Sequence, residues 1–130
     1  MKKLLLLCAV ILLAVTCKKV SQEPFGPTDI RISNVTDINM YNVTVNTYDS
    51  TFNYGTINAH SISDYHRFDR AYPTKANISA IVNGLKYKTD TVTSYSYLQY
   101  LGQMKVTYDV YSDIPPRLVI SKTTLDSPLK

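Results

Sequence analysis

The stretch ANISAIVNGLKYKTDTV, residues 76–92, carries the strongest local folding signal in the chain. Asn83 and Gly84 both tolerate positive φ, which a type I′ turn requires at its two central positions. In the second arm, apolar or hydroxyl side chains at positions 85, 87, 89 and 91 alternate with two lysines and an aspartate at positions 86, 88 and 90. Side chains in a strand point to alternate faces. The stretch therefore predicts an antiparallel hairpin with one face in water.

Alternation with a period of two recurs through the rest of the chain, most clearly where Tyr41, Val43 and Val45 point one way. This pattern predicts that Tyr41, Tyr87 and Tyr108 are in the core or half-buried. A turn is expected from Asn34 to Asn39. Further strands are expected around Ile30 and Ile32 and over residues 52–58, 63–70, 105–111 and 117–123, whereas residues 94–101 fit either a strand or a single helical turn.

The composition agrees with a β protein. Tyrosine occurs eleven times, tryptophan is absent, and Glu23 is the single glutamate in the sequence. β-branched and aromatic residues favour strands, and many short strands without an amphipathic helix are typical of a sandwich or barrel. We therefore predict an all-β fold, a single immunoglobulin-like or transthyretin-like sandwich of seven to eight antiparallel strands. The expected domain covers residues 28–125, with residues 126–130 as a C-terminal tail.

The positive charge of the chain is concentrated at its N-terminal end. The full sequence has a formal net charge of +4, but Lys2, Lys3, Lys18 and Lys19 lie before the predicted domain. From residue 29 onward ten basic residues face nine acidic ones. Nucleic-acid binding depends on a dense basic surface, so no nucleic-acid partner is expected.

The N-terminal residues have the layout of an export signal. Lys2 and Lys3 precede an apolar run from Leu4 to Val15, and these twelve residues are fewer than the roughly 20 that cross a bilayer. Residues 1–16 are therefore predicted to be a cleaved signal peptide. Residues 17–27 contain prolines, a glycine and polar residues and are predicted to be a tether.

Cys17 closes the apolar run, and this arrangement resembles the lipobox of bacterial lipoproteins, in which the cysteine becomes the lipid-bearing first residue. The lipobox usually has leucine three residues before the cysteine and a small residue just before it, where this chain has Ala14 and Thr16. The resemblance implies lipidation of Cys17. The alternative is an ordinary secretory signal with Cys17 as a leftover thiol.

Lys18 and Lys19 after the cysteine resemble the start of lipoproteins of the Bacteroidota. In the lipoprotein sorting pattern an aspartate after the cysteine favours the inner membrane, and here lysine occupies that position. The resemblance implies a protein anchored by its lipid in the outer membrane, facing either the periplasm or the exterior. With Cys8 removed and Cys17 acylated, the mature chain has no disulfide, so its core alone must hold the fold.

Chemistry-bearing residues are sparse. His60, Asp64 and His66 are the one cluster of plausible metal ligands, and they define an alternative function as a small periplasmic metal-binding protein or enzyme. Their spacing does not match zinc motifs, and there is no Gly-x-Ser-x-Gly element and no glycine-rich phosphate loop. No metal, no cofactor and no enzymatic activity are expected.

Tyr95, Tyr97 and Tyr100 are close together in the sequence and are predicted to form an exposed contact surface for an envelope protein or a glycan. The segments Tyr41-Asn42-Val43-Thr44-Val45, Tyr54-Gly55-Thr56-Ile57 and Ser63-Asp64-Tyr65 resemble those of small uncharacterised Bacteroidota lipoproteins with an immunoglobulin-like domain. This resemblance implies a fold and no activity. The sequence thus predicts a lipid-anchored cell-envelope lipoprotein that serves as a non-enzymatic binding or structural module.

Overall fold

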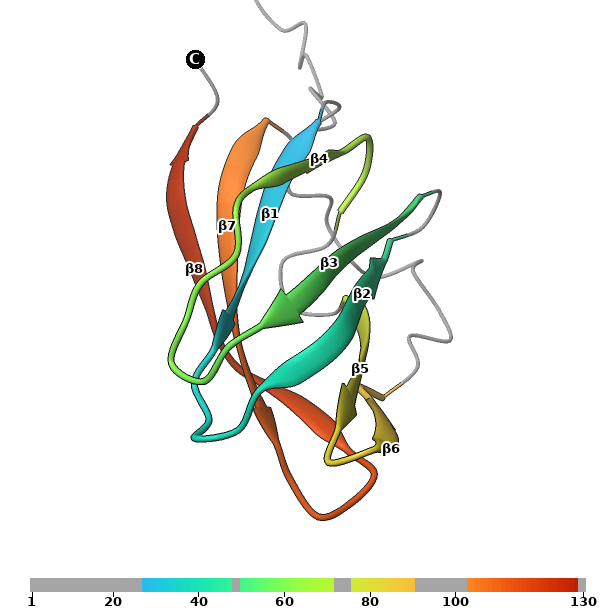
Figure 1. The fold of residues 1–130 in the computed structure, drawn as a ribbon. Helices are drawn as coiled ribbons and strands as arrows, with labels where there is room; N and C mark the ends of the chain where they lie inside the picture. The colour runs from blue at the N-terminus through green and yellow to red at the C-terminus, as the bar shows by residue number, and fades with distance from the viewer. Residues whose placement is uncertain (1–26, 48–49, 72–75, 91–102, 129–130) are drawn as a thin grey trace, which may run out of the picture.

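The computed structural model describes residues 27–47, 50–71, 76–90 and 103–128. In these residues the fold is all-β, without a helix, as predicted. Eight strands occur in the described part (Figure 1): β1 Thr28–Asn34, β2 Met40–Asn46, β3 Thr51–Ile57, β4 His66–Phe68, β5 Asn77–Val82, β6 Leu85–Lys88, β7 Met104–Ser112 and β8 Leu118–Pro128.

The strands form two sheets of four, in the orders β4-β1-β7-β8 and β3-β2-β5-β6. The pairing of β1 with β7 is parallel, with Ile30 opposite Val106 and Ile32 opposite Tyr108, and every other pair is antiparallel. The prediction of purely antiparallel strands is therefore wrong at this pair. Parallel neighbours need a long crossover connection, and here the second sheet separates β1 from β7 in the sequence.

One apolar core draws side chains from both sheets, which makes the fold sandwich-like. The largest buried side chain is Tyr108, which has no exposed surface, and Phe68 is 1% exposed. Tyr87 is also buried, so the predicted burial of Tyr87 and Tyr108 is confirmed. The smaller members are almost all aliphatic and alternate along their strands, as in Ile78, Ala80 and Val82 of β5.

Tyr41 does not share the buried face of Val43 and Val45, contrary to the prediction, and it is 46% exposed. The register of β2 against β3 shifts between Met40 and Val43, and Asn42 within this interval has a φ of 50°. A β-bulge inserts an extra residue and changes the face to which the neighbouring side chains point. Strict alternation therefore holds for Val43 and Val45 but not for Tyr41.

The predicted hairpin is confirmed as β5 and β6, with Asn83 at φ 50° and Gly84 at φ 78°. β6 ends at Lys88, earlier than expected. Thr89 ends the pairing, because its hydroxyl accepts from the amide of Ile78 at 2.9 Å and donates to the carbonyl of Ala76 at 3.0 Å. These contacts bury Thr89 beside the start of β5.

The last strand is longer than predicted. β8 continues to Pro128 because Lys105 and Met104 of β7 pair with Ser127 and Pro128, so these two residues are not a free tail. The start of β1 and the end of β8 lie at one end of the molecule, and the β1–β2, β5–β6 and β7–β8 connections lie at the other (Figure 1).

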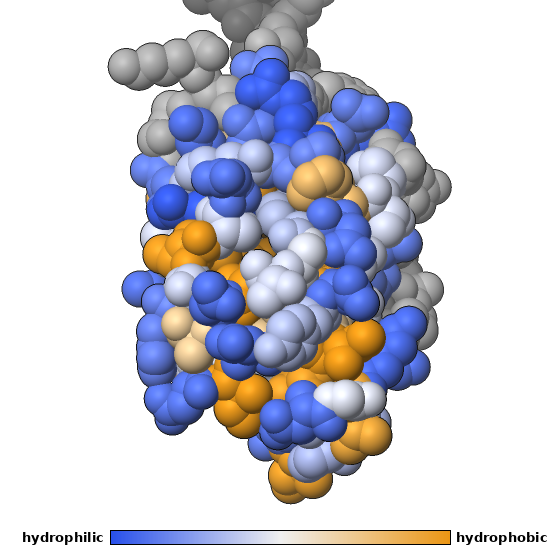
Figure 2. Space-filling model, in the orientation of Figure 1, coloured by the Kyte–Doolittle hydropathy of each residue, from blue (hydrophilic) through white to orange (hydrophobic). Residues whose placement is uncertain are grey.

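Several large apolar side chains are exposed in or beside the connections, among them Val35, Ile38, Leu85 and Ile114. Figure 2 shows apolar patches gathered toward the end that holds these connections, while the rest of this face is mostly polar. A search of the described residues for a helix long and apolar enough to span a bilayer finds none.

Candidate binding site

β3 and β4 are edge strands of different sheets, and a row of rings joins them. The His66 ring is stacked on Phe52 with centroids 3.5 Å apart, and Tyr54 and Phe68 meet the ends of this pair edge to face at 4.9 and 5.1 Å. Edge-to-face and stacked rings contribute stability beyond the area that they bury. The row therefore closes the side of the sandwich where β3 and β4 lie.

Residues 58–65 connect β3 to β4 and lie against β1. We call this segment the strap. The amide of Asn34 donates to the carbonyl of Ser61 at 3.0 Å, and the amide of Ser63 donates to the carbonyl of Ile32 at 2.9 Å. The Ser63 hydroxyl accepts in turn from the amide of Ile32 at 3.0 Å. These bonds hold the strap as an irregular segment, so the strand predicted over residues 63–70 is reduced to His66–Phe68.

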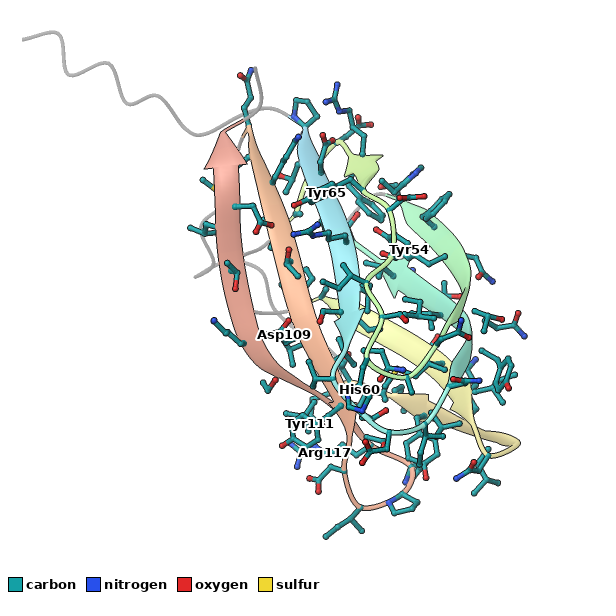
Figure 3. All side chains as sticks on the ribbon, turned by 60° about the vertical axis from the view of Figure 1, so that its left-hand side comes forward. Tyr54, His60, Tyr65, Asp109, Tyr111 and Arg117 are labelled. Atoms are coloured by element: carbon teal, nitrogen blue, oxygen red, sulfur yellow. The ribbon has the colours of Figure 1, made fainter. Side chains whose placement is uncertain are left out.

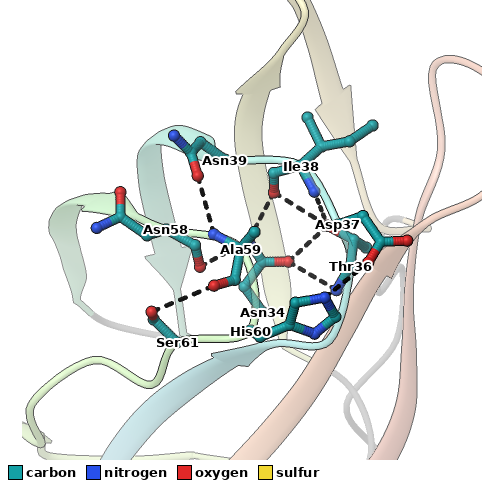
Figure 4. A network of polar contacts seen from close by, with 9 residues as sticks. All are labelled: Asn34, Thr36, Asp37, Ile38, Asn39, Asn58, Ala59, His60 and Ser61. Atoms are coloured by element: carbon teal, nitrogen blue, oxygen red, sulfur yellow. Dashed lines mark hydrogen bonds and ion pairs between the residues drawn. The ribbon is translucent and has the colours of Figure 1, made fainter.

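Asn34 is the centre of the polar network that fixes the strap (Figure 4). It is 1% exposed, and its side-chain nitrogen lies within hydrogen-bond distance of the carbonyls of Ile38, Ile57 and Asn58, at 2.8, 3.2 and 3.1 Å. Its side-chain oxygen accepts from the hydroxyl of Thr36 at 2.7 Å. One buried amide thus joins the β1–β2 connection to the end of β3.

A groove of about 430 Å³ lies between β3 and the strap. β3 pairs with β2 alone among the described strands, so its other edge faces this groove. Most lining side chains carry a hydroxyl or an amide, and Asp64 is the one charged residue among them. The lining consists of Phe52, Asn53, Tyr54, Thr56, Ile57, Asn58, Ser61, Ile62, Ser63, Asp64 and Tyr65.

Tyr54 joins β3, which forms one wall of the groove, to the β4-β1-β7-β8 sheet. Its hydroxyl donates to the carbonyl oxygen of Ile30 in β1 at 2.7 Å. Burial, with smaller contributions from Tyr108 and Asp29, raises the pKa of Tyr54 far above its usual value, so the phenol stays protonated. In Figure 3, Tyr54 and Tyr65 both lie close to the strap.

Tyr65 lines the groove, and its hydroxyl belongs to a polar network on the outer face of the β4-β1-β7-β8 sheet. The Tyr65 hydroxyl and the Thr107 hydroxyl both donate to Oδ2 of Asp126, at 2.8 and 2.6 Å. Arg31 donates to Thr107 at 2.8 Å, and its guanidinium lies 4.6 Å from the Tyr65 ring centre. Burial and the hydrogen bond to Asp126 raise the pKa of Tyr65. These contacts hold the end of the strap at Tyr65.

The structure does not bring His60, Asp64 and His66 together as a metal site. The His60 ring lies 2.7 Å from Oδ1 of Asp37, the His66 ring is stacked on Phe52, and Asp64 lines the groove. Among the residues that the structure describes, no group of three or more histidine, cysteine, aspartate or glutamate side chains is arranged to hold a metal ion.

Cys17 and the predicted contact surface of Tyr95, Tyr97 and Tyr100 lie outside the described residues, so both stay predictions. The sequence did not predict the groove, although the segments Tyr54-Gly55-Thr56-Ile57 and Ser63-Asp64-Tyr65 contribute Tyr54, Thr56, Ile57 and residues 63–65 to its lining. The sequence predicts both segments to be strands, which is confirmed for the first in β3 and wrong for residues 63–65. The signal that points to a strap is the presence of Asn58, Ser61, Ser63 and Asp64 within seven residues, because short polar side chains are typical of irregular backbone.

No protein-family model matches the chain. No curated protein matches it either. Among solved structures, an NMR structure of a protein from Eubacterium rectale is similar to this chain with a TM-score of 0.49 and 18% sequence identity, and the match covers 78% of this chain and 95% of that chain.

Proposed function

We propose that this chain is a lipid-anchored lipoprotein of the outer membrane that acts as a non-enzymatic binding module. The anchoring half of the proposal rests on the signal layout of residues 1–16, on Cys17 and on the absence of aspartate after it. A protein with several acyl chains on its first residue is held stably at a membrane. Residues 18–27 then separate the lipid from β1.

The binding half of the proposal rests on one observation, the polar groove between β3 and the strap. Its lining offers hydroxyl and amide groups with a single carboxylate and no cation. Such a lining favours a neutral ligand that carries many hydroxyl groups over an anionic one. We therefore propose a glycan chain of the cell envelope as the ligand of this groove.

The groove supports binding better than catalysis. Hydrolysis of glycosidic bonds uses a pair of acidic residues that flank the bond. Among the described residues that line the groove, Asp64 is the one acidic residue. The side-chain amide of Asn58 points away from the network around Asn34 (Figure 4), so the amide is available to a ligand.

We also propose that the sandwich is of the immunoglobulin-like or transthyretin-like type.

The anchor is tested by replacing Cys17 with serine in the full chain. We expect the wild-type protein to fractionate with the outer membrane and its mature N-terminus to carry acyl chains by mass spectrometry. The C17S variant should lose both properties. Cleavage and release of the wild-type chain without acylation would establish plain secretion and refute the anchor.

The groove is tested with variants that change its lining and leave the Asn34 network intact. We expect Asn58→Ala and Asp64→Asn each to weaken binding to glycans extracted from the envelope by about tenfold, the equivalent of one or two hydrogen bonds. Thr44→Ala, on a separate hollow of about 350 Å³ formed by β2, β5 and β6, is the matched control. Equal binding by the variants and the control would remove the groove as the glycan site.

A further inference from the structure

The hollow of about 350 Å³ lies on the outer face of the β3-β2-β5-β6 sheet. Pairing brings side chains into a row across this face, because Thr44 of β2 lies opposite Ser79 of β5 and Ser79 lies opposite Lys88 of β6. Both neighbours of Ser79 in β5 are buried, so Ser79 points outward. Lys86 lies two residues before Lys88 and shares its face. Two lysines thus line one side of the hollow.

The positive charge of the hollow is not neutralised by the described residues around it. No aspartate or glutamate is among the described residues that line it. The ion pairs between described residues include neither Lys86 nor Lys88, and both lysines are exposed. The acid that follows most closely in the sequence, Asp90, is held by Arg117 at 2.8 Å. Both ammonium groups are therefore available to an anion.

Hydroxyl groups beside the lysines have protons left to donate. The Ser79 hydroxyl has no hydrogen bond to another residue in the described part of the chain. The Thr51 hydroxyl accepts from the side-chain amide of Asn46 at 2.9 Å, so its own proton is left for a ligand. The Thr44 hydroxyl, in contrast, donates to the carbonyl of Asn42 at 3.1 Å. Free donors beside two ammonium groups favour a ligand with negatively charged acceptor oxygens.

The size and lining of the hollow indicate what carries the negative charge. A volume of about 350 Å³ is within the range of small-molecule sites, about 300–1,000 Å³, and exceeds what a simple ion needs. No aromatic side chain is among the described lining residues, so the hollow offers no ring on which a nucleobase could stack. Apart from the buried Ile78, the described lining carries hydroxyl, amide and ammonium groups. This lining favours a hydrophilic ligand body such as a sugar.

We propose that the hollow binds an acidic saccharide, a sugar that carries a carboxylate or a phosphate group. Lys86 and Lys88 contact the anionic group, and Ser79 and Thr51 donate to sugar oxygens. The Cα atoms of residues two apart in a strand are separated by about 6.6 Å, so two long lysine side chains on one face can reach the same anion. This site is separate from the groove beside the strap, whose described lining has a carboxylate and no cation.

Titration of the full chain in detergent, followed by nuclear magnetic resonance, tests this site. The probes are a galacturonate trisaccharide, a hexose phosphate, the neutral trisaccharide maltotriose and inorganic phosphate. We expect at least one acidic sugar to shift the amide signals of Ser79 and Lys88 and to bind at least about tenfold more tightly than maltotriose. Comparing the two acidic sugars identifies the anionic group. Binding of neither acidic sugar would overturn the proposal, as would shifts at Asp64 of the groove in place of Ser79. Inorganic phosphate that binds as tightly as the acidic sugars would reduce the hollow to an ion site and overturn the saccharide.

Charge variants separate this site from general attraction to a basic protein. We expect Lys88→Gln to weaken binding of the acidic sugar at least about threefold, and the added Lys86→Gln change to extend the loss to at least about tenfold. Lys88→Arg keeps the charge and should retain most of the affinity. Lys122→Gln, at an exposed position of β8 in the other sheet, is the matched control and should bind as wild type does. Equal losses in Lys88→Gln and Lys122→Gln would overturn the proposal.

Discussion

The side-chain nitrogen of Asn34 lies 3.2 Å from the carbonyl oxygen of Ile57, a buried contact between the end of β1 and the end of β3. It joins the two sheets where the strap begins. The same nitrogen lies near two further carbonyls, so this position needs a donor and not merely a polar group. The groove depends on this requirement, because the strap forms one of its walls.

Asn34→Asp should destabilise the fold although the two side chains have the same shape. The substitution replaces a donor that faces three carbonyls with an oxygen that repels them. We expect a loss of about 2–4 kcal/mol in the free energy of unfolding, since buried polar groups left without partners cost about 1–3 kcal/mol each. Urea unfolding followed by circular dichroism measures it, with the exposed Asn46→Asp as the control. Equal losses in the two variants would contradict the role of the amide.

Tyr54→Phe removes the hydroxyl that donates to Ile30 and leaves the ring contact with Phe52 in place. We expect a loss of about 1 kcal/mol in unfolding free energy, typical of one hydrogen bond between uncharged groups. The ring packing should survive, so near-ultraviolet circular dichroism should keep its shape. Tyr54→Ala should cost several times more, and a phenylalanine variant as unstable as the alanine variant would show that the hydroxyl, not the ring, dominates.

Alkaline pH should destabilise the protein through its buried phenols. Burial raises the pKa of both Tyr54 and Tyr108 above the ordinary value of 10.0. Above about pH 10 the unfolded chain releases these protons while the folded chain keeps them, so stability falls as pH rises. Urea midpoints between about pH 8 and about pH 11 should fall more steeply for wild type than for the Tyr54→Phe variant. Parallel slopes would mean that Tyr54 ionises normally in the folded state.

The sequence predicted the structure best where the structure depends on residues that are close together in the chain. The β5–β6 hairpin depends on Asn83 and Gly84, two adjacent residues that alone supply the turn geometry. Burial of Tyr87 and Tyr108 follows from alternation within single strands. Where a bulge interrupts the alternation, as at Asn42, the same reasoning placed Tyr41 on the wrong face.

The features that the sequence did not predict depend on contacts between residues that are far apart in the chain. The parallel pairing of β1 with β7 joins strands that most of the chain separates, and no local pattern specifies it. The groove has the same character, because its walls are held by bonds from Asn34 and Ile32 to Ser61 and Ser63. These bonds join backbone groups of residues far apart in the chain, and the alternation of side chains carries no trace of them.

Gly84→Ala should cost about 1 kcal/mol or more in unfolding free energy, because a left-handed conformation is unfavourable for a residue with a Cβ atom. The glycine has a φ of 78°, and no atom lies within 4 Å of the position that a Cβ would take. The cost is therefore one of backbone strain and not of collision. Lys86→Ala, on the adjacent strand, is the control. Thermal unfolding of the two variants compares them, and an unchanged glycine variant would argue against the tight turn.

His60→Gly should leave the protein as stable as wild type or slightly more stable. His60 has a φ of 55°, which glycine adopts without strain, and its ring lies 2.7 Å from the highly exposed Asp37. Exposed ion pairs contribute at most about 1 kcal/mol, so the relief of strain offsets the lost contact. Zinc should not raise the melting temperature of wild type or variant, because His66 is held in the ring stack. A zinc-dependent rise in wild type that disappears in His60→Gly would instead establish a metal site.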